Sequence, residues 1–373
     1  MKRLLVIADG MADEACDALG GLTPLAYLHN KHLDDLAAEG FAGAVMTVPE
    51  GCDTASETAI PAILGYDPLT PGWGRGMLEA AGLGIELQPG MVAFRINVSS
   101  DAVGRWDAEG LASLVDRRED VSFVPLKPGR FLMIMNEGQC LVDCPAPYRS
   151  SSGKVSSAAC VRAIAPQAED TARFLNGMIT RSCGEVIPWG PSEGCRLIPF
   201  SQLHPGFGRG AVISGVPLVN GLGRLAGMEC ISVAGATGDC DTDYRAKAEA
   251  ALTALDTHDF VLLHIEAPDE ASHRRDARAK LKAISDIAEN VVGRLAKELA
   301  GRDVRMVFMP DHATSVSTGR HLAGPVPFIV WGRGVGRLNS ASRYDESLCR
   351  PGPVMPCKGF LERVFGDLRQ KEP

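Results

Sequence analysis

The chain has 373 residues, of which 45% are hydrophobic and 23% charged, and its formal net charge at pH 7 is −8. This composition excludes a disordered or fibrous chain, the length favours two domains, and the modest negative charge gives no indication of a nucleic-acid partner. Eleven scattered cysteines without a CxxC pair favour free thiols in a reducing cytoplasm. The apolar run at the N-terminus is too short for a signal peptide or a membrane span, so we expect a soluble cytoplasmic protein.

The N-terminal part of the sequence predicts a strand, a helix and a second strand. Residues 4–8 form a continuous apolar run, as expected for a central parallel strand covered on both faces. Asp9 follows directly, so a carboxylate lies where this strand ends. Residues 33–40 predict an amphipathic helix that ends in a glycine, and residues 42–48 resemble a second strand.

Residues 49–68 predict a polar loop that enters a short helix, with Ser56 as its N-cap or first-turn residue. A capping serine is the plain interpretation. The functional alternative is a serine nucleophile, because free N–H groups at a helix N-terminus favour an incoming phosphate and a bound metal could lower the pKa of the hydroxyl. Thr54 competes for the same role on the residues alone.

The pattern of the sequence changes near residue 90. Residues 92–98 alternate like a half-solvated strand, and residues 130–135 form another apolar run. A serine-rich stretch before Lys154 indicates a polar connection, and residues 168–179 predict an amphipathic helix. We therefore predict an inserted α+β domain over 90–205 with an antiparallel sheet.

Alternating strands and helices resume after the insert. They are predicted at 210–214, 216–226, 230–233, 242–255, 260–265, 281–299, 304–309 and 327–330. This alternation on both sides of the insert predicts an α/β fold, in which a doubly wound and mostly parallel sheet forms a core domain from residues 1–89 and 206–373.

Carboxylate and imidazole side chains follow several of the predicted strands. They are Asp9, Asp269, His273, Asp311, His312 and His321. Because parallel strands end at one edge of a sheet, we expect these side chains to lie together, and the four-residue spacing of Asp269 and His273 places both on one face of a helical turn. Three carboxylates and three imidazoles are about the number that two divalent metal ions need, and two such ions can clamp a phosphoryl group.

Nine segments of the chain resemble one known family in order and spacing. They are Asp9-Gly10, Ser56 to Pro68, Gly74-Arg75-Gly76, Glu79 to Ile85, Val92-Ala93-Phe94-Arg95, Asp116-Arg117-Arg118, Gly235-Ala236-Thr237-Gly238, Asp269 to His273, and Asp311-His312 to His321. Together they resemble the archaeal-type cofactor-independent phosphoglycerate mutases, which belong to the alkaline phosphatase superfamily. The resemblance covers nearly the whole core and part of the inserted domain.

The resemblance implies a two-metal centre of manganese, magnesium or zinc, and no use of 2,3-bisphosphoglycerate. One ion would be held by Asp269, His273 and His321, and the other by Asp9, Asp311, His312 and the nucleophile. The family pattern assigns the nucleophile to Ser56 and not to Thr54. It further implies that Ser56 takes the phosphoryl group of a small substrate such as 3-phosphoglycerate and returns it to the other hydroxyl, as in glycolysis, while the inserted domain acts as a cap that excludes water.

Four arginines in matching motifs are the candidate substrate-binding residues: Arg75, Arg95, Arg117 and Arg118. Lys154 and Lys247 are weaker candidates. The chain departs from the family pattern at Ile60, where the family has histidine or asparagine, and in a shortened cap after Arg118. Because these departures lie where the substrate would be held, a related phosphatase, or a phosphotransferase like the homoserine kinases, is the alternative. A non-catalytic binding protein is disfavoured, because adjacent buried carboxylates are costly to keep.

Overall fold

The computed structural model describes residues 1–70, 72–144, 161–336, 341–350, 353–366 and 368. The chain forms two compact units, of which the first comprises Met1–Pro68 with Ile198–Pro373 and the second Leu69–Leu197. The predicted boundaries lie after residues 89 and 205. The first junction lies earlier because helix α4 (Arg75–Gly82) packs on three strands of the second unit. Among the described residues no helix is both long and apolar enough to cross a membrane.

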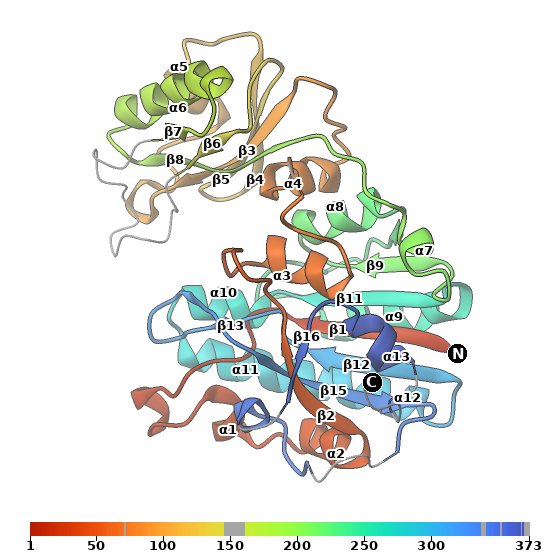
Figure 1. Ribbon diagram of the computed structural model, residues 1–373. Coiled ribbons are helices and arrows are strands. Elements are labelled where there is room, and N and C mark those ends of the chain that lie inside the picture. The colour runs from red at the N-terminus through yellow and green to blue at the C-terminus, as the bar shows by residue number, and fades with distance from the viewer. Residues whose placement is uncertain (71, 145–160, 337–340, 351–352, 367, 369–373) are drawn as a thin grey trace. The chain divides into compact units, whose positions relative to one another are not determined.

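An eight-stranded sheet forms the centre of the first unit, in the order β10-β9-β11-β1-β12-β15-β2-β16 (Figure 1). Its strands are β1 (Lys2–Ala8), β2 (Phe41–Met46), β9 (Gly210–Ile213), β10 (Glu229–Cys230), β11 (Phe260–Ile265), β12 (Val304–Met309), β15 (Val326–Gly332) and β16 (Val354–Pro356). Strand β15 runs antiparallel to both of its neighbours, and the other pairings in this sheet are parallel. The predicted α/β class with a mostly parallel sheet is therefore confirmed.

Helices cover both faces of this sheet. They are α1 (Pro24–Leu28), α2 (Lys31–Glu39), α3 (Ser56–Ile63), α7 (Phe200–Leu203), α8 (Pro217–Leu225), α9 (Tyr244–Thr257), α10 (Ala267–His273), α11 (Ala277–Ile287), α12 (Arg294–Leu299) and α13 (Phe360–Phe365). On one face Leu4 and Val261 pack against α9 and α11, and on the other the Phe260 ring contacts the rings of Phe200 and Phe365. The helix predicted at 281–299 contains a π-helical segment, Ala288–Gly293, between α11 and α12.

The second unit contains a four-stranded antiparallel sheet in the order β4-β5-β3-β8. Its described elements are β3 (Val92–Val98), β4 (Val121–Lys127), β5 (Arg130–Met135), β6 (Val142–Asp143), β7 (Arg162–Ala163), β8 (Val186–Glu193), α4, α5 (Ala108–Leu114) and α6 (Glu169–Arg181). Buried side chains of β3 and β5 pack against α5 and α6 in a core of their own. The predicted polar connection around Lys154 lies outside the described residues.

A buried ion pair ties α11 to the loops that leave β1 and β12. The Lys280 ammonium, with a fully buried side chain, donates to the Asp13 carboxylate at 2.7 Å and to the carbonyl oxygens of Thr314 and Ala12 at 2.7 and 3.3 Å. The same carboxylate accepts from the backbone N–H of Val316. The pair therefore joins two chain segments that flank the edge of the sheet.

We expect Lys280→Met to lower the free energy of unfolding by about 3–5 kcal/mol, because it leaves the Asp13 carboxylate buried without its cation. Urea denaturation of the metal-free protein measures this change. Lys282→Met on the same helix is the matched control, since the Lys282–Asp286 pair is largely exposed on its lysine side and should contribute less than about 1 kcal/mol. An effect of Lys280→Met no larger than that of Lys282→Met would contradict a role for the buried pair.

Candidate metal centre

The candidate ligands lie at the carboxyl edge of three adjacent strands, β11, β1 and β12. Asp9 follows β1, Asp269 lies on α10 directly after β11, and Asp311 and His312 follow β12. Strands β1 and β12 pair in parallel up to Ile7 and Met309, so their ends lie side by side. The parallel register thus brings together the carboxylates that the sequence places far apart.

One group of candidate ligands consists of Asp269, His273 and His321. Asp269 and His273 are one helical turn apart on α10, and Asp269 Oδ2 lies 3.0 Å from His273 Nε2. His321 begins the short strand β14 (His321–Leu322), and its Nε2 lies 3.2 Å from His273 Nε2 and 3.6 Å from Asp269 Oδ1. Two imidazole nitrogens and a carboxylate therefore converge on one point, as in a site for a divalent transition metal.

Hydrogen bonds to backbone carbonyls fix the orientation of the His273 and His321 rings. His273 Nδ1 donates to the carbonyl oxygen of Gly319 at 2.9 Å, and His321 Nδ1 donates to that of Thr54 at 2.7 Å. Because each Nδ1 carries its proton toward a carbonyl, each Nε2 is the nitrogen left to bind a cation. A hydrogen bond on the far nitrogen is the usual support of a metal-binding histidine.

The ionised form of the Asp269 carboxylate is strongly favoured in this group. Burial alone would raise the pKa of Asp269, but the neighbouring His273 and His321 hold it well below its ordinary value. Burial alone would lower the pKa of His273, whereas the Asp269 carboxylate raises it to about 9. The group therefore attracts positive charge, which a divalent ion would supply in place of protons.

The second group consists of Asp9, Asp311 and His312, with Ser56 beside it. His312 Nε2 lies 3.6 Å from Asp9 Oδ1 and 3.4 Å from Asp311 Oδ2. The Ser56 hydroxyl donates to Asp9 Oδ2 at 3.1 Å and lies 3.3 Å from His312 Nε2. Ser56 is the first residue of α3 and its side chain makes no cap hydrogen bond, so its hydroxyl faces the acidic group instead.

The second group has the chemistry of a cation site. Asp9 and Asp311 are both fully buried, and Asp9 Oδ1 and Asp311 Oδ2 have no hydrogen-bond partner among the described residues. Burial raises the pKa of Asp9 well above its ordinary value, and the nearby charge of Asp311 raises it further. Two unpaired carboxylate oxygens beside an imidazole nitrogen fit a divalent ion, which would relieve their repulsion.

Residues that the sequence did not single out support Asp9 from behind. His264, within β11, donates through Nε2 to Asp9 Oδ2 at 3.0 Å, and its Nδ1 accepts from Ser214 Oγ at 3.1 Å. Burial lowers the pKa of His264 to about 3, so the imidazole is neutral. Asp9, His264 and Glu266 also form a third group of possible ligands, but these hydrogen bonds give His264 an orienting role. The signal was a histidine inside an otherwise apolar strand.

Lys247 lies behind the same strand. Its fully buried ammonium donates to the carbonyl oxygens of Thr237 and His264 at 3.1 and 3.4 Å, and burial lowers its pKa to about 8. A role of Lys247 in anion binding stays a prediction.

The four arginines expected to bind substrate lie in the second unit, where they pair with three different acidic partners. Arg75 Nε donates to the buried carboxylate of Glu79 at 2.9 Å, and Arg95 Nε donates to the same carboxylate at 2.8 Å. Arg117 and Arg118, beyond the end of α5, instead pair with Glu109 and Asp120. These partners were not foreseen, and the role of the arginines in substrate binding stays a prediction.

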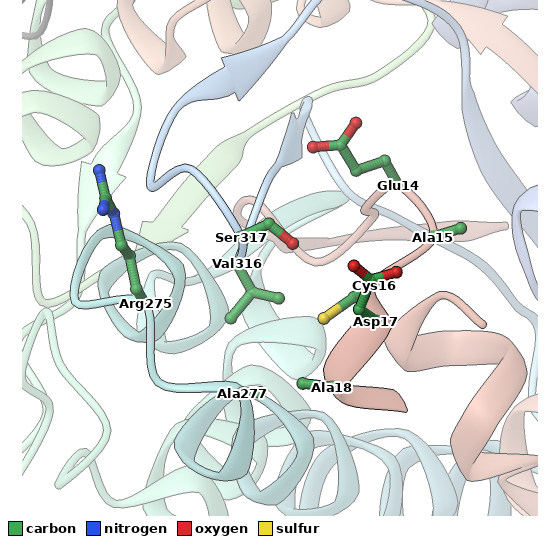
Figure 2. Close-up of a pocket in the computed structure, with 9 residues that line it drawn as sticks. All are labelled: Glu14, Ala15, Cys16, Asp17, Ala18, Arg275, Ala277, Val316 and Ser317. Carbon is green, nitrogen blue, oxygen red and sulfur yellow. The ribbon is translucent and has the colours of Figure 1, made fainter. Parts of the chain in front are cut away.

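A cavity of about 380 Å³ lies beside the loops that carry the candidate ligands (Figure 2). Its lining consists of Glu14, Ala15, Cys16, Asp17, Ala18, Arg275, Ala277, Val316 and Ser317. None of these nine residues belongs to the two ligand groups, so this cavity is distinct from the candidate metal centre.

Carboxylates and imidazoles lie together where the parallel strands of an α/β sheet end, and this arrangement is typical of a metalloenzyme. The model of the Metalloenzyme superfamily matches residues 1–356, so the chain belongs to this class. The chain is 34% identical over 387 residues to 2,3-bisphosphoglycerate-independent phosphoglycerate mutase 2 of Methanothermobacter thermautotrophicus, a match covering 95% of this chain and 94% of the relative. It is 33% identical over 391 residues to the corresponding mutase of Methanosarcina barkeri, covering 95% and 96%. The chain therefore belongs to the family of 2,3-bisphosphoglycerate-independent phosphoglycerate mutases, as its motifs predicted.

Solved structures have the same fold. A protein from Pyrococcus horikoshii matches with a TM-score of 0.77 at 24% identity, covering 100% of this chain and 98% of the other. The cofactor-independent phosphoglycerate mutase from Thermoplasma acidophilum matches with a TM-score of 0.59 at 22% identity, covering 98% and 99%. At these identities the two structures support the fold.

Proposed function

We propose that the protein interconverts 2- and 3-phosphoglycerate by phosphoryl transfer through Ser56, with two divalent ions of manganese, magnesium or zinc and without 2,3-bisphosphoglycerate. One observation carries this proposal: a serine hydroxyl at the start of α3 lies within 3.3 Å of both a buried carboxylate and an imidazole of the candidate metal centre. The relatives named as phosphoglycerate mutases support the choice of substrate. A location in the cytoplasm is part of the same proposal.

In the proposed reaction Ser56 Oγ attacks the phosphorus of the substrate. Its proton passes toward Asp9 Oδ2, which already accepts from this hydroxyl, while a new P–O bond forms and the bond to the glycerate oxygen breaks. The departing glycerate oxygen takes up the proton that Asp9 received. The glycerate then turns, and its other hydroxyl attacks the phosphorylated serine in the reverse sense, giving its proton to Asp9 as Ser56 Oγ departs and recovers it. The N-terminus of α3, the positive end of the helix dipole, favours the anionic group. Divalent ions, when bound, supply positive charge to the transferring phosphoryl oxygens.

The product formed from 3-phosphoglycerate tests this function. With Mn²⁺ and no 2,3-bisphosphoglycerate, we expect the full chain to form 2-phosphoglycerate until the two esters reach equilibrium, as followed by ³¹P NMR. The same assay after chelation should show no conversion, and added Mn²⁺ should restore it. Inorganic phosphate as the main product would establish a phosphatase instead. Transfer that requires an added acceptor alcohol would establish a phosphotransferase.

A further inference from the structure

Thr314 lies between the two candidate ion groups and touches one member of each. It belongs to the short strand β13 (Ala313–Thr314) and is fully buried. Its hydroxyl Oγ1 donates to Asp269 Oδ1 at 2.6 Å and lies 3.2 Å from His312 Nδ1. Asp269 belongs to the group with His273 and His321, whereas His312 belongs to the group beside Ser56.

The hydroxyl proton decides the direction of both hydrogen bonds. A threonine hydroxyl has one proton, and the short contact with the Asp269 carboxylate uses it. The remaining contact must then be donated by His312 Nδ1, whose proton points to Oγ1. In the neutral imidazole this leaves the lone pair on Nε2, the nitrogen that faces Asp9, Asp311 and Ser56. One hydroxyl thus sets the orientation of a carboxylate and the tautomer of an imidazole.

The backbone holds this hydroxyl in place. The N–H of Thr314 donates to the carbonyl oxygen of Ala12, and its own carbonyl accepts from Lys280 Nζ at 2.7 Å. Across the strand pair Thr314 lies opposite His321, a member of the first group. These backbone contacts fix the position of the Thr314 hydroxyl, and this position determines where Asp269 and His312 form their hydrogen bonds with it.

Gly10 provides the space for this arrangement. Its backbone has φ +60°, and a Cβ at this position would lie 2.5 Å from Asp269 Oδ1 and 2.6 Å from Thr314 Oγ1. Any side chain at position 10 would therefore displace the hydroxyl or the carboxylate. The need for glycine after Asp9 is explained by the contact between Thr314 and Asp269.

We propose that the Thr314 hydroxyl is a shared positioning group that aligns Asp269 of one ion site and His312 of the other. The inference rests on the proposed function, because it takes both groups as ion sites. Loss of a hydrogen-bond partner behind a metal ligand typically lowers metal affinity about 10–100-fold. Loss of this hydroxyl weakens two sites at once, whereas loss of a hydroxyl that supports no ligand weakens neither.

Thr314→Val removes the hydroxyl with little change of shape, and Thr314→Ser keeps it. Ser315→Ala is the matched control, because the adjacent hydroxyl is equally buried but donates to Glu14, which belongs to neither group. Mn²⁺ binding to the chelated full chain is measured by calorimetry and by the paramagnetic resonance of free Mn²⁺. We expect the valine variant to bind both ions at least about 10-fold more weakly. The serine and control variants should remain within about threefold of wild type.

A second readout separates positioning from chemistry. In the valine variant the Mn²⁺ concentration for half-maximal activity should rise about as much as the dissociation constants, while kcat at saturating Mn²⁺ falls much less. Mn²⁺ affinities within threefold of wild type in Thr314→Val would overturn the inference, as would an equal loss in Ser315→Ala or no recovery in Thr314→Ser. Wild-type protein that binds no divalent ion would overturn the proposed function itself.

Discussion

Ser56→Ala is expected to lower the rate of 2-phosphoglycerate formation by about 10⁴-fold or more, the usual scale for loss of a catalytic nucleophile. The structure gives the reason, since Ser56 Oγ is the hydroxyl that lies between Asp9 Oδ2 and His312 Nε2. A coupled assay at saturating Mn²⁺ measures the rate. Incubation with ³²P-labelled substrate, followed by acid quenching, should label the wild-type chain and leave the variant unlabelled.

Thr54→Ala is the informative control for this experiment. It removes the other hydroxyl of the same loop but keeps the carbonyl oxygen that accepts from His321 Nδ1. We expect the Thr54 variant to retain at least about a tenth of the activity, because only its side chain changes. Activity that survives in Ser56→Ala and is lost in Thr54→Ala would reverse the assignment of the nucleophile.

The proximity of the candidate metal ligands was predictable because their positions follow from simple rules. Asp9 and Asp311 come directly after continuous apolar runs, and parallel pairing of β1 with β12 requires their ends to meet. The spacing of Asp269 and His273 fixes their shared helical face. His321 was expected near this edge because it follows His312 closely, but only the resemblance assigned it to the group of Asp269 and His273, since nothing local shows that a hairpin returns it to Asp269.

The supporting contacts were not predictable, because they depend on packing between distant segments. His264 looks like one polar residue in an apolar strand, and its partner Asp9 is 255 positions away. The motifs did not show that Arg75 and Arg95 share the carboxylate of Glu79. Glu79 lies one turn after Arg75 on α4, and Arg95 lies on β3. The junction at residue 69 also depends on packing, since α4 precedes the strands on which it lies.

Asp9 contacts Ser56, the proposed nucleophile, and His264, and it belongs to the second group of candidate ligands. Its replacement should therefore separate activity from stability. We expect Asp9→Asn to lower activity by about 10³-fold or more, because the uncharged amide is a poor ligand for a divalent ion and a poor acceptor for the Ser56 proton. The loss should persist at high Mn²⁺. The same variant should nevertheless stabilise the metal-free protein.

The pKa of Asp9 gives the sign of this stability effect. Burial, with the charges of Asp311 and Glu266, raises the folded-state pKa well above the unfolded value. A raised carboxyl pKa means that the contribution of Asp9 to the stability of the metal-free wild type is greatest below the unfolded pKa and falls as pH rises toward the folded pKa. Asparagine cannot ionise, so urea denaturation after chelation should find the variant more stable than wild type by about 1 kcal/mol or more at pH 8. The difference should shrink toward pH 4, and added Mn²⁺ should stabilise wild type far more than the variant. A metal-free variant that is less stable than wild type at pH 8 would contradict the raised pKa of Asp9, because ionised Asp9 would then not destabilise the folded protein.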